Sequence, residues 1–454
     1  MKRGIFTFLT SIIILAIFLQ DGDYFNAGVA FTSFAISIWS VIAIFNSRNL
    51  SFSLYKMFHT FSLLFFGISP YLQYINGVKF WKVGSGFTAE DYLITNLILL
   101  FCLLIFEVVY KWGYGTRTLT PETSKKVLYT TKISLPLTTK LLLLVLSAVS
   151  VLTTLISYDF NLLKLFLRGS DLFESPDEVT PLDHIVTNFF RPLSIFVFTI
   201  YFYYTRSWDF FSIIFLLVGL FCNFPTGLAR YNVAALYIPM FLAVIPSLRY
   251  GFRFNVIMIL GFLVVFPLLN TFRTFSKSQA VKIGFDFEMF TEGHFDSYSS
   301  LLRVIKYNMI TYGDQLLGVI FFWVPRKFWP EKARGSGAYM AKELNLYYDN
   351  LAMNYYAEGY LNFGIYGLIL FAVALPAAFA FFDRKFIENL NTTRDFSILY
   401  FTLVGFSIFL LRGDLQSSTA YLLGFLCMVF FLMLVIRLGN KKFTADGVSA
   451  KVKE

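Results

Sequence analysis

Four charged residues at the ends of apolar runs could act together on a phosphorylated substrate. Glu358 stands in NYYAEGYLNFG, and three arginines, Arg230, Arg326 and Arg412, stand in PTGLARYN, WVPRKFWPEKARG and LLRGDL. An arginine is always charged and can hold two phosphate oxygens at once. A carboxylate among aromatic side chains can accept a proton from a hydroxyl. We therefore predict that the arginines bind a diphosphate and that Glu358 is the base. Any one arginine would also suit a lipid headgroup or a local acid, and Glu358 a loop lysine.

Further residues are predicted to bind the substrate around these four. They are Arg168 in an acidic loop, Arg273 after an apolar run, and Lys327, Lys332, Arg334 and Tyr360 near the catalytic set. His294 and Asp414 are weaker candidates for the base. The three cysteines lie in apolar runs without metal-binding spacing, and P-loop and dinucleotide patterns are absent. We expect neither a metal nor a cofactor.

The composition predicts the elements that must position these residues. Of 454 residues, 57% are hydrophobic, 20% are aromatic and only 15% are charged. Apolar runs long enough to cross a bilayer recur along the chain. The net charge of +10 has no basic domain outside these runs, which argues against a nucleic-acid partner. The sequence therefore predicts an all-α polytopic membrane protein.

The apolar runs predict about twelve transmembrane helices. The expected spans are 4–20, 27–45, 57–75, 93–110, 141–157, 188–204, 210–223, 232–246, 255–271, 364–382, 396–411 and 419–437. Loops rich in unpaired Lys and Arg alternate with loops of mixed charge. With both termini in the cytoplasm, every basic loop is cytoplasmic, as the positive-inside rule requires.

This topology divides the chain into four parts. Residues 1–272 hold spans one to nine, 273–363 form one long periplasmic loop with interfacial helices, 364–437 hold spans ten to twelve, and 438–454 are a cytoplasmic tail. Within the loop, Leu316–Val324 is apolar but too short to span, so we expect it at the membrane interface or folded back into the bundle. Ionisable residues are rare at the middle of the spans, which disfavours an ion-coupled transporter.

The sequence resembles the O-antigen and common-antigen polysaccharide polymerases, the Wzy family. The matching pieces are TGLARYN, WVPRKFWPEKARGSG, EGYLNFGIYG and LLRGDL, in that order, and Arg326 and Gly337 stand at the Arg-x10-Gly spacing of such loops. The resemblance implies a GT-C-like, metal-independent, inverting glycosyltransferase of the bacterial inner membrane. It implies that both donor and acceptor are oligosaccharides on undecaprenyl diphosphate, and that a separate chain-length regulator is a partner.

Arginine stabilisation of a diphosphate leaving group fits this reading, because that group needs cations and no acid. The long loop also has no Asp-x-Asp metal motif. Two alternatives stay open. One is an O-antigen ligase, although such ligases have a histidine where this chain has Glu358. The other is a flippase or exporter of lipid-linked oligosaccharide, which would need a polar path through both leaflets.

Overall fold

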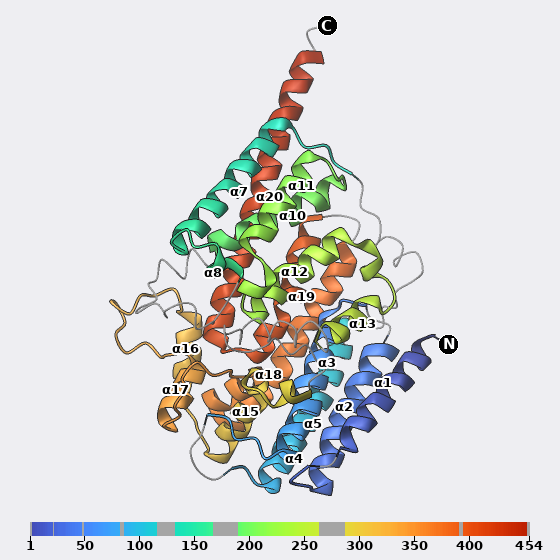
Figure 1. Cartoon of the computed structure of the whole chain (residues 1–454), viewed down its shortest axis with the longest axis vertical. Coiled ribbons are helices and arrows are strands. Elements are labelled where there is room, and N and C mark those ends of the chain that lie inside the picture. The colour runs from blue at the N-terminus through green and yellow to red at the C-terminus, as the bar shows by residue number, and fades with distance from the viewer. Residues whose placement is uncertain are drawn as a thin grey trace. The chain divides into compact units, whose positions relative to one another are not determined.

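The chain folds into helices joined by turns. The computed structural model describes residues 2–20, 22–47, 50–81, 86–115, 132–166, 189–262, 287–389 and 394–451, and these ranges contain no strand (Figure 1). Seven helical stretches in them are long and apolar enough to cross a membrane. They are α2 (Ala27–Asn46), α5 (Ala89–Tyr114), α7 (Leu137–Ser157), α11 with the turn after it (Phe210–Gly227), α18 (Tyr355–Glu388), α19 (Arg394–Arg412) and α20 (Leu415–Lys451). The protein is therefore a multi-pass helical membrane protein.

Several of the twelve predicted spans correspond to helices shorter than a full membrane span. Two are apolar but short, α1 (Lys2–Phe18) and α12 (Arg230–Val244). The predicted span 57–75 is divided into α3 (Leu54–Phe61), a π-helix (Ser62–Ile68) and α4 (Ser69–Ile75). The span 188–204 is represented by α10 (Arg191–Thr205), and 255–271 by α13 (Arg253–Leu260), after which residues 263–286 lie outside the described part.

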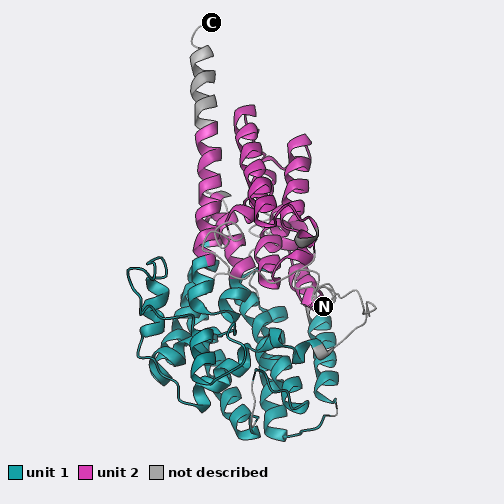
Figure 2. Ribbon diagram, turned by 60° about the vertical axis from the view of Figure 1, so that its left-hand side comes forward, with its two compact units in different colours: residues 1–120, 286–385, 407–420 teal, residues 121–285, 386–406, 421–454 magenta. Residues whose placement is uncertain are grey.

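The chain forms two compact units that do not follow chain order (Figure 2). Unit 1 contains residues 1–120, 286–385 and 407–420, and unit 2 contains residues 121–285, 386–406 and 421–454. Glu358, Arg326 and Arg412 belong to unit 1, whereas Arg230 belongs to unit 2.

In unit 1, small residues allow the helices to approach closely. Ser33, Ser37 and Ser40 of α2 are buried, and a methyl group on Gly67 of the π-helix would lie 2.2 Å from Ser37 Oγ. Small residues at such positions are typical of membrane helix interfaces.

Polar side chains of the spans hold the segment 287–354, which contains α15 (Ser297–Lys306), α16 (Asp314–Ile320) and α17 (Ser336–Glu343). Gln73 Nε2 donates to the carbonyls of Phe290 (2.9 Å) and Phe295 (3.0 Å). Asn96 on α5 accepts from the Tyr298 hydroxyl at 2.9 Å and donates to Thr32 on α2. This segment is therefore fixed on α4 and α5.

Helix α18 starts inside the predicted loop and is kinked. Asn354 accepts hydrogen bonds from the N–H groups of Tyr356 and Ala357, an N-cap that begins the helix before Glu358. Phe363 and Gly364 have non-helical angles, with φ of 61° at Gly364, where glycine is favoured. The predicted boundary at residue 364 therefore coincides with the kink, while Glu358 lies on a helical turn.

At the opposite end of α18, the Asp383 carboxylate joins this helix to the start of α3 and the end of α5. The charge pattern assigns these three helix ends to the cytoplasmic side. The carboxylate accepts from the N–H groups of Leu54 and Tyr55 at the start of α3, at 3.0 and 3.2 Å. It also accepts from the hydroxyl of Tyr110, near the end of α5. Unit 1 thus joins these three segments through one buried carboxylate.

Unit 2 packs α10 against α7, α11 and α12. Asn223, after α11, donates to the carbonyl of Arg191 at 3.0 Å, and Arg191 Nε donates to the carbonyl of Cys222 at 2.6 Å. Gly405 of α19 lies against Pro239 of α12, because a methyl group there would be 2.7 Å from Pro239 Cδ.

Candidate functional site

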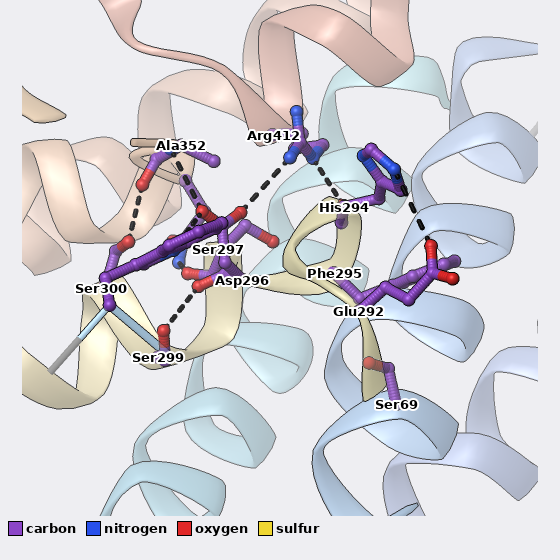
Figure 3. Close-up of polar contacts among 12 residues, drawn as sticks. Ser69, Glu292, His294, Phe295, Asp296, Ser297, Ser299, Ser300, Ala352 and Arg412 are labelled. Carbon is purple, nitrogen blue, oxygen red and sulfur yellow. Dashed lines mark hydrogen bonds and ion pairs between the residues drawn. The ribbon is translucent and has the colours of Figure 1, made fainter. Parts of the chain in front are cut away.

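Arg412, the last residue of α19, is held at a fixed position by the segment before α15 (Figure 3). Its Nε donates to the carbonyl of His294 at 2.8 Å, and its Nη2 lies 3.1 Å from Asp296 Oδ1. A quarter of the side chain is exposed (25%), and Nη1 has no protein partner within the described ranges. The guanidinium is therefore oriented and still has donors for an anion.

Asp296 is the buried carboxylate that orients Arg412. Its second oxygen accepts from Trp81 Nε1 at 3.2 Å and from the N–H of Ala352 at 3.5 Å. Burial raises the pKa of Asp296 above its usual value, and the neighbouring Arg412 charge opposes that shift. The ion pair and the two N–H donors compensate for part of the cost of burying this carboxylate.

The same region is joined to the start of α18. The Ser300 hydroxyl donates to the carbonyl of Ala352 (Figure 3). Asn354 Nδ2 donates to the carbonyl of Ser297 at 2.6 Å. Asn354 also caps α18, so Arg412 and the first turn of α18 share one hydrogen-bonded framework.

Glu358 lies in this first turn and is fully buried, with 0% of its surface exposed. Its Oε2 accepts from Ser336 Oγ at 2.7 Å, and its Oε1 accepts from the N–H of Leu415 at 2.8 Å. The carboxylate therefore joins the first residue of α17 to the first residue of α20. Each of its oxygens accepts a hydrogen bond from the protein, and the sequence could not indicate these partners.

Asp414 reaches the same turn before α17. One oxygen accepts from the N–H of Gly337 at 3.3 Å, and the other accepts from the N–H of Ser417 at 3.0 Å. A methyl group on Gly335 would lie 2.6 Å from this carboxylate, and one on Gly337 would lie 2.2 Å from the carbonyl of Leu351. Glycine is needed at both positions, and the close contact brings the segment after Arg334 to the segment after Arg412.

Arg326 and Lys332 are directed into the backbone of their own loop. Arg326 donates to the carbonyls of Lys332 and Ala333, and Lys332 Nζ donates to the carbonyls of Phe322 (2.5 Å) and Val324 (3.0 Å). Burial, with a contribution from the Arg326 charge, lowers the pKa of Lys332. These two cations therefore shape the loop.

The other predicted binding residues of unit 1 lie at the surface. Lys327 and Arg334 are exposed, and neither has an ion-pair partner in the described part of the chain. The Tyr360 hydroxyl donates to Asn308 Oδ1 at 3.0 Å, while Glu358, two residues earlier on α18, contacts Ser336 and Leu415.

His294 is the partly exposed titratable group beside Arg412. Its Nε2 lies 3.6 Å from Glu292 Oε2, and about a third of its side chain (33%) is exposed (Figure 3). Its carbonyl accepts from Arg412, so the residue that carries a potential base is in direct contact with a potential phosphate-binding cation.

Three predicted residues are not part of this cluster as described. Arg168 and Arg273 lie outside the described residues. Arg230 begins α12 in unit 2, so its convergence with the residues of unit 1 stays a prediction. In unit 2, the sequence analysis also missed Arg191, which is buried at the start of α10 and whose Nη1 donates to the Tyr158 hydroxyl.

Asp296 and Ser336 were missed for a different reason. Each has a common residue type at the start of a short helix, and its role depends on a partner far away in sequence, 116 residues for Asp296 and Arg412 and 22 for Ser336 and Glu358. The one signal was the charge of Asp296 in a segment rich in Ser and aromatic residues.

Among the described residues, no group of three or more His, Cys, Asp or Glu side chains is placed to hold a metal ion. An Asp-x-Asp sequence does occur outside the long loop, at residues 21–23 before α2, and its described member, Asp23, is exposed.

Chemically, the site offers the oriented guanidinium of Arg412, the pair of His294 and Glu292, and two buried carboxylates, Asp296 and Glu358. These two carboxylates contact the end of α19 and the starts of α17 and α20. This combination suits an anionic leaving group and a hydroxyl nucleophile. Comparison with protein-family models, curated proteins and solved structures finds no match to this chain.

Proposed function

We propose that the protein is a polymerase of oligosaccharide repeat units carried on undecaprenyl diphosphate. It would be an inverting, metal-independent glycosyltransferase with a GT-C-like arrangement of about twelve spans, acting at the periplasmic face of a bacterial inner membrane. The observation that carries the proposal is Arg412: a guanidinium held by Asp296 and the His294 carbonyl at the end of an apolar helix, with donors left for a ligand. The charge of a lipid diphosphate lies at the membrane surface, where such an apolar helix ends.

The reaction forms one bond and breaks one bond. The acceptor hydroxyl oxygen attacks the anomeric carbon of the donor glycan while the bond from that carbon to the diphosphate oxygen breaks. The diphosphate leaves with the electron pair, and Arg412 stabilises its growing charge, with Arg334 as a further cation. No proton has to be given to the diphosphate.

The proton of the acceptor hydroxyl needs a base, and His294 suits this role better than Glu358. His294 is partly exposed and contacts Arg412 through its own carbonyl, and Glu292 Oε2, 3.6 Å from its Nε2, would stabilise the imidazolium formed when the ring takes up the proton. Glu358 is fully buried with both oxygens occupied. We therefore assign Glu358, together with Asp414, to positioning the turn before α17 and the start of α20.

The test is to incubate purified protein with one synthetic lipid-linked repeat unit and separate the products on a gel. A ladder of polymers supports the proposal, because this substrate is then both donor and acceptor. A ligase would need a lipid A core acceptor and would give no ladder. The Arg412→Ala variant should give none, whereas Arg253→Ala, at an exposed arginine that begins α13, should match the unchanged protein.

A further inference from the structure

Residues 316–328, here called the 316–328 segment, expose large apolar side chains outside any spanning helix. The segment comprises most of α16 and the loop after it. Trp323 is 67% exposed and Phe328 is 78% exposed, and Leu317, Ile320 and Phe321 are also exposed. Such a concentration of apolar surface indicates a site of interaction rather than contact with water.

The opposite side of α16 packs on spanning helices. Val319 contacts Phe371 of α18 and Leu415 of α20 in a buried apolar cluster. The N–H of Leu316 donates to Asn362 Oδ1 at 2.8 Å, and the N–H of Thr311 donates to the carbonyl of Leu361 at 2.7 Å. Because Phe371 follows the kink at Gly364, α16 is fixed beside the part of α18 that is predicted to span the membrane.

The residue just before α16 lies against an exposed part of α18. A methyl group on Gly313, just before α16, would lie 2.9 Å from the ring of Phe363. Phe363, Tyr366 and Leu370 are exposed on α18, as apolar residues of a spanning helix are where they face lipid. The 316–328 segment therefore begins next to this exposed part of α18.

Backbone carbonyls of the loop are hydrogen-bonded within the protein, as an apolar medium requires. The carbonyls of Phe322 and Val324 accept from Lys332 Nζ, and those of Lys332 and Ala333 accept from Arg326. A carbonyl left without a hydrogen bond in an apolar environment is strongly unfavourable. Two internal cations thus satisfy four carbonyls that water would otherwise have to satisfy.

The charges of the loop complement a lipid surface. Lys327 stands exposed between the apolar positions 323 and 328, and Arg334 is exposed further on, against a single acid, Glu331, in residues 316–334. Tryptophan and lysine side by side are typical of residues at the headgroup level.

We propose that the 316–328 segment inserts into the membrane interface on the side of the long loop, with Trp323 and Phe328 at the level of the acyl chains and Lys327 on the headgroup phosphates. This inference does not depend on the proposed glycosyl transfer. It also assigns Arg326 and Lys332 to building a membrane-bound element, a role separate from phosphate binding.

The test uses single cysteines carrying an environment-sensitive fluorophore. Cys427→Ser removes the exposed native cysteine, while Cys102 and Cys222 are buried. Ile320→Cys and Phe328→Cys report on the segment, and Glu343→Cys, on an exposed position of α17, is the matched control. The labelled proteins are placed in vesicles of phosphatidylcholine with phosphatidylglycerol, with brominated acyl chains in one set and aqueous iodide added to another.

We expect brominated lipid to quench the labels at 320 and 328 and iodide to reach them several-fold more slowly than it reaches the label at 343. Lys327→Ala should reduce lipid quenching at 328 in vesicles with phosphatidylglycerol. Equal iodide quenching at all three positions, without quenching by lipid, would overturn the proposal. Protection that appears only after membrane proteins are added would overturn it too, because the surface would then bind a protein. If one labelled variant does not fold, the other position decides. A chain without polymerase activity can still give the expected quenching, so the two proposals fail separately.

Discussion

Arg412 and Asp296, separated by 116 residues in sequence, form an ion pair of 3.1 Å in which the carboxylate is buried and the guanidinium keeps a quarter of its surface. The pair connects the end of α19 to the segment before α15. An arginine fixed in this way does not lose side-chain entropy when it binds an anion, because its orientation is already set.

Replacement of Arg412 should stop polymer formation while the protein stays in the membrane. Arg412→Ala loses a charge-assisted contact that strengthens as the glycosidic bond breaks, about 3 kcal/mol or a hundredfold in rate. Arg412→Lys should restore little, since an ammonium group cannot donate to His294, Asp296 and a phosphate in the same geometry. The gel ladder measures both, with Arg253→Ala as the control. Normal ladders from Arg412→Ala would show that the diphosphate binds elsewhere, for example at Arg334.

Replacement of His294 should affect turnover more than substrate binding. His294→Gln keeps a polar side chain but cannot accept the proton at a useful rate, so lipid-linked substrate should bind while the ladder disappears. Imidazole added to His294→Ala should restore part of the activity, because the side chain is partly exposed. Single-turnover assays with and without imidazole measure this. Full activity of His294→Gln would exclude it as the base.

Glu358 should behave as a positioning residue. Glu358→Gln can still accept from the Leu415 N–H and can donate to Ser336 Oγ, so we expect a folded protein with a substantial fraction of its activity. Glu358→Ala leaves both partners unsatisfied in a buried site, and we expect it to lose about 2–4 kcal/mol of stability. Thermal unfolding in detergent and the gel assay separate the two effects. Normal folding with no turnover in Glu358→Gln would return the base role to Glu358.

The predicted topology can be tested at positions chosen from the structure. Phe290, which the sequence places in the long loop, is fully buried and would not react, whereas Glu343 of α17 is exposed. In a Cys427→Ser background, a membrane-impermeant maleimide applied to whole cells with a permeable outer membrane should label Glu343→Cys. It should not label Tyr250→Cys, which is exposed and predicted to be cytoplasmic, until the inner membrane is opened. The reverse pattern would invert the orientation.

Activity should not require a divalent metal. The proposed leaving-group stabilisation uses arginine, so a chelator should leave the ladder unchanged. Asp23→Asn tests the Asp-x-Asp sequence at residues 21–23 in the same assay and should also be active. Loss of activity with chelator, restored by Mg²⁺ or Mn²⁺, would mean that a metal ion stabilises the leaving group together with Arg412.

The sequence by itself located the seven long apolar helices. The predicted spans 27–45 and 396–411 correspond to Ala27–Asn46 and Arg394–Arg412, and the predicted boundary at 364 falls on the kink of α18. Runs of apolar residues of sufficient length must be helical in a bilayer, since only a helix satisfies its own backbone there. The prediction that the apolar residues 316–324 lie at the interface stays a prediction, and the exposure of that segment supports it.

Only the tertiary structure decided what the charged side chains contact. Composition indicated that Glu358, Arg326 and Lys332 were unusual, but it could not indicate that Glu358 joins two helix ends or that the two cations hold carbonyls of their own loop. It gave no weight to Asp296, whose partner Arg412 is far away in sequence. The physical reason is that a hydrophobic run acts through its length and local pattern, whereas a charge acts through its neighbours within a few ångströms, and those neighbours are set by packing.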